Sequence, residues 1–93
     1  MSYELVFIAQ PDLDEEKLAA LVQKFTALVQ SLGGQVAQID GKGKRLLAYP
    51  IRKLREGYYY VAQIQLAKDA LKELDRSLKL TEQIVRYLIV TKE

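Results

Sequence analysis

The segment from residue 14 to residue 33 most constrains the fold of this chain, because it carries the pattern of a long amphipathic helix. Its apolar side chains recur three and four positions apart, and they are Leu18, Leu21, Val22, Phe25, Leu28, Val29 and Leu32. This spacing predicts one continuous apolar stripe along the helix. Asp14 is a suitable N-cap, and Gly33 suits the left-handed position that ends a helix. Such a stripe must be covered by other elements of the chain.

The remainder of the chain predicts four strands and a shorter helix. Residues that favour strands dominate the ranges 3–9, 36–51, 58–66 and 84–90. Leucines at positions 71, 74 and 78 predict the second helix, with a weaker N-cap signal at Asp69 or before it. Because Pro50 cannot donate a hydrogen bond to a neighbouring strand, the second strand is predicted to lie at a sheet edge. Gly41 and Gly43 within this strand predict a bulge or a bend.

The resulting order is β-α-β-β-α-β in a single domain that spans residues 1–93. Both strand–helix–strand connections should be right-handed, which places the two helices on the same face. We therefore predict an α+β fold of the ferredoxin-like type, with a four-stranded antiparallel sheet and both helices on one face.

The composition excludes several kinds of site. The chain has no cysteine and no histidine, which removes disulfides, thiolate metal sites and the commonest general base. No apolar run approaches the ~18 residues of a membrane span, and no secretory leader is visible. We expect a cytoplasmic protein with no metal, no cofactor, no membrane contact and no small-molecule substrate.

Alternation along the predicted strands divides their side chains between two faces. The face without helices should hold an apolar centre with a polar rim, which is typical of a protein interface. We predict that this interface includes Glu4, Val6, Ile8, Tyr59, Val61, Gln63, Leu88 and Val90. Gln65 and Arg86 complete the predicted rim. The alternative is plain exposure, since strands favour β-branched residues wherever they lie.

The segment from Lys42 to Arg55 contains six basic residues and no acidic one. An apolar stretch at positions 46–51 divides these cations into two groups, and Leu47, Tyr49 and Ile51 are predicted to join the core. The basic loop from Arg52 to Gly57 is predicted to turn the chain. Cations at both ends of an ordered strand suit phosphate groups. The alternative is a solvated hairpin that keeps an edge strand from aggregating.

The sequence Gly43-Lys-Arg-Leu-Leu-Ala-Tyr-Pro-Ile-Arg52 resembles the signature of the bacterial small-subunit ribosomal protein number six family. Gly57-Tyr-Tyr59 and the stretch at positions 85–90 also look like strands of that family. Leu46 departs from the signature, because the family usually carries a charged or amide side chain there. The resemblance covers essentially the whole chain and implies the same ferredoxin-like fold.

The resemblance also implies a structural role in the small ribosomal subunit in the cytoplasm. It implies binding to the central domain of small-subunit ribosomal RNA, together with small-subunit ribosomal protein number eighteen. The expected RNA-binding residues are Lys42, Lys44, Arg45, Arg52, Lys53, Arg55 and Arg86. Part of the open sheet face, or the edge of the second strand, is expected to contact the protein partner.

Two other classes have the same element order. An RNA-recognition motif that binds single-stranded RNA would stack bases on strand aromatics, but alternation sends Phe7, Tyr58 and Tyr60 toward the helices. An acylphosphatase would need a phosphate loop with glycine and arginine after the first strand, and Ala9-Gln-Pro-Asp12 has neither. We therefore expect no enzymatic activity, and keep the RNA-recognition motif as the alternative function.

Overall fold

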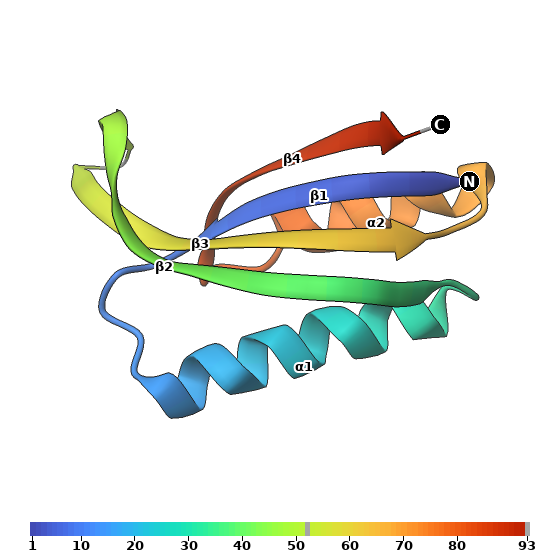
Figure 1. The fold of residues 1–93 in the computed structure, drawn as a ribbon, viewed down its shortest axis with the longest axis horizontal. Helices are drawn as coiled ribbons and strands as arrows, with labels where there is room; N and C mark the ends of the chain where they lie inside the picture. The colour runs from blue at the N-terminus through green and yellow to red at the C-terminus, as the bar shows by residue number, and fades with distance from the viewer. Residues whose placement is uncertain (52, 93) are drawn as a thin grey trace.

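The computed structural model describes residues 1–51 and 53–92, and its elements follow the predicted order. They are β1 (Ser2–Ala9), α1 (Glu15–Ser31), β2 (Gln35–Ile51), β3 (Leu54–Gln65), the short 3-10 helix η1 (Lys68–Ala70), α2 (Leu71–Lys79) and β4 (Ile84–Lys92). The strands form one antiparallel sheet in the order β2-β3-β1-β4 (Figure 1). The ferredoxin-like fold is confirmed, and β2 lies at a sheet edge as Pro50 predicted.

Helix α1 begins and ends where the sequence predicted. The Asp14 carboxylate accepts a hydrogen bond from the backbone N–H of Lys17 at 2.8 Å, which satisfies one of the free donors at the helix start. At the other end Gly33 has a φ of 83°, and the N–H of Gly34 donates to the carbonyl of Val29. These contacts fix where the chain leaves the helix and enters β2.

The N-cap of the second helix was predicted at Asp69 or before it, and Asp69 itself does not cap the helix. Helix α2 begins at Leu71, and Ala70 precedes it with helical dihedral angles and no side-chain cap. The chain enters this helix through η1, whose backbone is already helical. The extended residue at the start of this helical run is Ala67, which lies before Asp69 and makes no side-chain cap. A 3-10 turn often leads directly into an α-helix in this way.

The hydrophobic core lies between the sheet and the two helices. Phe7 of β1 is fully buried, with its ring centroid 5.4 Å from that of Phe25 on α1 and 5.1 Å from that of Tyr60 on β3. Leu74 of α2 belongs to the same hydrophobic cluster, and the half-buried Tyr58 packs against this cluster. Phe7, Tyr58 and Tyr60 thus face the helices as predicted, and they are not available as a platform for stacked bases.

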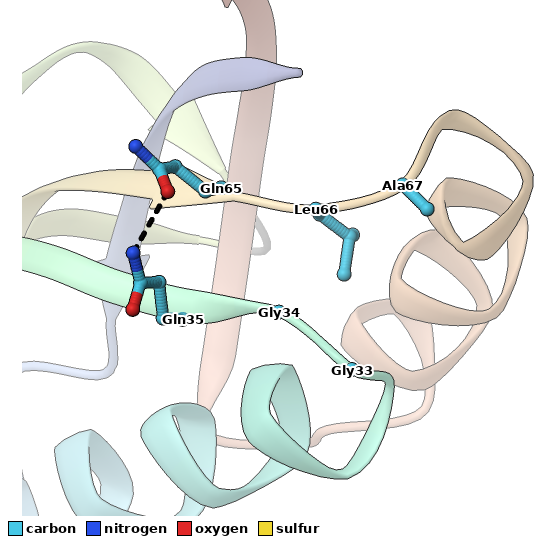
Figure 2. A pocket seen from close by; sticks show the side chains of 6 residues that line it. All are labelled: Gly33, Gly34, Gln35, Gln65, Leu66 and Ala67. Carbon is cyan, nitrogen blue, oxygen red and sulfur yellow. Dashed lines mark hydrogen bonds between the residues drawn. The ribbon is translucent and has the colours of Figure 1, made fainter.

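The connection between α1 and β2 packs closely against the end of β3 (Figure 2). Gln35 Nε2 donates to Gln65 Oε1 at 2.7 Å. The shallow recess beside this pair has a volume of about 210 Å³ and is lined by Gly33, Gly34, Gln35, Gln65, Leu66 and Ala67. None of these six lining residues has a charged side chain.

The β2–β3 hairpin is longer than the sequence predicted. The predicted loop from Arg52 to Gly57 is wrong from Leu54 onward, because Leu54 already begins β3 and pairs with Ile51. The predicted irregularity at Gly41 and Gly43 is confirmed by a shift of register between them. Beyond that point the hairpin bends away from the line of the sheet, on the side opposite α1 (Figure 1).

Candidate RNA-binding and protein-binding surfaces

The uncovered face of the sheet has the side chains that alternation predicted. Strand pairing aligns Val61, Val6 and Leu88 in one row, and Gln63, Glu4 and Val90 in the next. Within the second row, Gln63 Nε2 donates to Glu4 Oε1 at 2.9 Å. Leu88 is 60% exposed and Val90 is 40% exposed. The outer half of this face is therefore an apolar strip beside a polar hydrogen-bonded pair.

The inner half of the uncovered face lies beneath the β2–β3 hairpin. Ile8 and Tyr59 pair across β1 and β3 on this face, yet Ile8 is only 8% exposed. Between hairpin and sheet lies a recess of about 290 Å³, and its lining residues are Ile8, Leu47, Ala48, Tyr49, Ile51, Tyr59, Arg86 and Leu88. The hairpin thus partly covers one end of the surface that the sequence predicted to be open.

The predicted placement of Leu47, Tyr49 and Ile51 in the core is wrong. These side chains lie against the open face of the sheet instead, and Tyr49 is 55% exposed. The pairing of β1 with β3 ends at Ala9 and Tyr58, so the hairpin extends past the part of the sheet that the helices cover. Its apolar side chains bury against the nearest apolar surface, which is the opposite face.

Arg86 and Tyr49 join the two edges of the sheet. The Arg86 guanidinium on β4 donates a hydrogen bond to the hydroxyl of Tyr49 on β2. It also lies 5.6 Å from the centroid of the Tyr49 ring, within the range of a cation–π contact. Since β2 and β4 are the two outer strands, this contact crosses the whole width of the sheet. Nothing in the alternation pattern could have paired these two residues.

The predicted cations of the hairpin are exposed to solvent, and those described are Lys42, Lys44, Arg45, Lys53 and Arg55. The prediction for Arg52 lies outside the described residues. Arg45 Nε donates to the backbone carbonyl of Lys42 at 3.1 Å, which ties this side chain to the bulge. Lys53 has a φ of 67°, in the left-handed region, as is common for a residue in a tight hairpin turn.

Lys44 has two neighbours that the sequence pattern did not predict. Glu56 lies just beyond the acid-free segment, and its carboxylate is 3.8 Å from Lys44 Nζ. The Lys44 ammonium also lies 5.2 Å from the centroid of the Tyr58 ring. Lys44 is therefore partly neutralised, whereas Lys42 and Lys53 have no such partner among the described contacts. Leu46, the residue that departs from the family signature, is 78% exposed.

Other kinds of site find no support in the described part of the chain. Within residues 1–51 and 53–92, no three acidic side chains gather where a metal ion could be held. The helices described there are also too short or too polar to cross a membrane. A ferredoxin-like domain with a basic hairpin and an apolar sheet face belongs to the class of proteins that act by binding through surfaces.

Comparison with known proteins identifies the family. The sequence profile named "Ribosomal protein S6" matches residues 2–91. The chain is 44% identical over 92 residues to small ribosomal subunit protein bS6 of Moorella thermoacetica, covering 99% of this chain and 94% of the relative. It is 38% identical to bS6 of Carboxydothermus hydrogenoformans, covering 98% and 95%. A crystal structure of 30S ribosomal protein S6 from Thermotoga maritima superposes with a TM-score of 0.92 at 28% identity, covering 98% of this chain and 86% of that one.

The chain therefore belongs to the ribosomal protein S6 family. This confirms the resemblance seen in the signature at positions 43–52, despite the departure at Leu46. Membership makes the chain a ribosomal protein of the small subunit rather than an enzyme, and it places the chain at the ribosome in the cytoplasm.

Proposed function

We propose that the chain binds small-subunit ribosomal RNA through the cations of its β2–β3 hairpin. The observation that carries this proposal is the set of five exposed cations on one paired ribbon, Lys42, Lys44, Arg45, Lys53 and Arg55. Strand pairing fixes the backbone of Lys44 and Arg45 directly, Arg55 lies within β3, and Lys42 and Lys53 lie at the bulge and at the turn between paired residues. Basic side chains on one rigid element match the regular spacing of phosphates along RNA.

The chemistry of this contact is mainly electrostatic. Lys42 and Lys53 act as compact charges beside phosphate oxygens, while the planar guanidinium of Arg55 forms paired hydrogen bonds with them. Each neutralised phosphate releases bound counterions, so the affinity falls as salt rises. Contacts of this kind position the protein on folded RNA but carry little sequence information.

We further propose that the outer half of the open sheet face contacts small-subunit ribosomal protein number eighteen. The apolar side chains of Val6, Val61, Leu88 and Val90 supply the centre of this interface, with Leu88 and Val90 exposed and the two valines at positions 6 and 61 half-buried. The Glu4–Gln63 pair lies at its polar rim. Apolar centres with polar rims are the usual anatomy of protein interfaces. Ile8 and Tyr59 lie partly under the hairpin and contribute the inner border.

The test is a binding titration with a central-domain fragment of small-subunit RNA. Affinity is measured with and without protein eighteen, over a series of salt concentrations. We expect tighter binding in the presence of the partner and a linear fall of the logarithm of the binding constant with the logarithm of salt. An affinity that ignores both the partner and the salt would overturn the proposal.

A further inference from the structure

The hairpin that carries the candidate RNA-binding cations needs an anchor. Beyond Ala9 and Tyr58, where β1 stops pairing, the structure continues as the two strands β2 and β3 alone. An isolated two-stranded ribbon is marginally stable and twists freely. The direction in which its cations point must therefore be set by contacts with the rest of the molecule.

Those contacts are concentrated at one place on the open face. The apolar side chains of Leu47 and Ile51 lie over Ile8 and Leu88 around the 290 Å³ recess. Above this apolar layer, the Arg86 guanidinium donates to the Tyr49 hydroxyl and lies near the face of its ring. The apolar contacts have no preferred direction, whereas the hydrogen bond and the ring contact do.

We propose that Arg86 is a positioning residue, which holds Tyr49 and thereby orients the hairpin cations toward RNA, rather than a residue that contacts phosphate. This inference rests on the proposed RNA-binding function of the hairpin. It also revises the role expected for Arg86 from the sequence, where it was grouped with the phosphate-binding cations. One of its donors already bonds to a phenol on the far edge of the sheet, which also fixes the direction of the side chain.

The two roles of Arg86 differ in what they do to the salt dependence of RNA binding. A cation that neutralises a phosphate adds about 0.7 to 0.9 to the slope of log affinity against log salt. A positioning residue changes the affinity through preorganisation of other cations and leaves the number of neutralised phosphates unchanged. The slope and the affinity, measured together, separate the two roles.

Tyr49→Phe is the most selective variant, because it removes only the hydroxyl that accepts from Arg86 and leaves every charge in place. We expect it to weaken RNA binding about two- to tenfold, the effect of one hydrogen bond, with an unchanged salt slope. Arg86→Gln should also leave the slope unchanged. Arg55→Gln is the matched control, and it should lower the slope by about 0.7 to 0.9.

Amide hydrogen exchange of the hairpin supplies a readout that needs no RNA. If the contact holds the hairpin, Tyr49→Phe and Arg86→Gln should speed exchange at the amides of residues 44–49, 51 and 54–57, and Arg55→Gln should not. Unchanged exchange in both variants would overturn the anchoring role. Faster exchange with unchanged RNA affinity would overturn the orienting role.

The remaining outcomes are also decisive. If Tyr49→Phe leaves RNA affinity intact while Arg86→Gln lowers the salt slope, Arg86 contacts phosphate directly and the proposal is wrong. If the wild-type protein shows no salt-dependent RNA binding, the proposed function fails, and with it the orienting role of Arg86. Exchange at the hairpin then reports separately whether the anchor exists.

Discussion

Position 34 requires glycine because neighbouring atoms leave no room for a Cβ atom, and not because of its backbone dihedral angles. A Cβ atom at this position would be 2.3 Å from the carbonyl oxygen of Gln65 and 2.7 Å from Leu66 Cδ1. Gly34→Ala should therefore destabilise the protein by roughly 2–3 kcal/mol, because backbone must move to relieve the overlap. Gly33→Ala is the control. Its Cβ meets nothing within 4 Å, so only the left-handed φ costs about 1 kcal/mol. Urea unfolding measures both, and a larger loss for Gly33→Ala would contradict this account.

Asp14 acts through one hydrogen bond, from the N–H of Lys17 to its carboxylate. Asp14→Ala should lower the free energy of unfolding by about 1 kcal/mol, the usual effect of losing an N-cap. Asp12→Ala removes an exposed carboxylate from the same connection and should stay within about 0.5 kcal/mol of wild type. Equal losses in the two variants, measured by thermal or urea unfolding, would mean that local charge rather than capping stabilises α1.

At the scale of elements, sequence patterns predicted both α-helices and all four strands, but not the short η1 helix or the course of the β2–β3 hairpin. The spacing of the apolar residues from Leu18 to Leu32 is compatible only with a helix, because only a helix places those side chains on one side. Alternation in β2 also defines two faces, but it does not say which face meets an apolar surface. That depends on where β1 stops pairing with β3, a long-range fact that no local pattern of Leu47, Tyr49 and Ile51 contains.

The hairpin as an element should act through its charges. Lys42→Gln and Lys53→Gln each remove one exposed cation, so each should lower the salt slope of RNA binding by about 0.7 to 0.9. Lys24→Gln and Lys72→Gln are matched controls on α1 and α2, and both side chains are exposed. These controls should leave the RNA titration unchanged. Unfolding free energies of all four variants should stay within about 0.5 kcal/mol of wild type, and equal slopes in all four would disprove the role of the hairpin.

Strand β4 presents the most exposed apolar side chain of the open face. Leu88→Glu places a charge in the centre of the proposed interface, and it should weaken binding to protein eighteen at least about tenfold, as desolvating an unpaired charge is costly. Leu80→Glu is the control, because Leu80 is 73% exposed and follows α2 rather than lying on the sheet. Calorimetric titration of protein eighteen measures both variants. If both variants bound protein eighteen with equal affinity, the open sheet face would not be part of the interface.

At the scale of the whole molecule, the sequence correctly predicted which side chains share a face of the sheet. It did not predict which parts of that face stay exposed to solvent. Strict alternation assigned Val6, Val61 and Leu88 to one face, and the strand register, which aligns them in one row, agrees with that assignment. The burial of Ile8 on that same face could not be predicted, because the covering side chains come from an edge strand that crosses the sheet. Local patterns thus predict the layers of a fold, whereas contacts between distant strands decide which parts of a layer remain available for binding.

The helix layer and the sheet are joined by a titratable contact between Tyr87 on β4 and Asp75 on α2. The Tyr87 hydroxyl donates to the Asp75 carboxylate and lies 3.1 Å from the Asp75 backbone carbonyl. Burial, and then the neighbouring Asp75, raise the pKa of Tyr87 to about 12. The hydrogen bond from Tyr87, together with Lys79, holds the pKa of Asp75 below its ordinary value of 3.8. The contact therefore depends on a protonated phenol and an ionised carboxylate.

This dependence predicts loss of the contact at both ends of the pH range. The contribution of Tyr87 is complete below its ordinary pKa of 10.0 and is lost as the pH rises through about 12. That of Asp75 is complete above 3.8 and is lost as the pH falls through its lowered pKa. A double-mutant cycle of Tyr87→Phe and Asp75→Asn measures the coupling free energy by urea unfolding. The titration of Tyr60, whose pKa burial also raises, is common to all four proteins and cancels. The coupling should be constant between about pH 5 and 9 and shrink by about pH 11, and a coupling that persists there would show that packing alone joins α2 to β4.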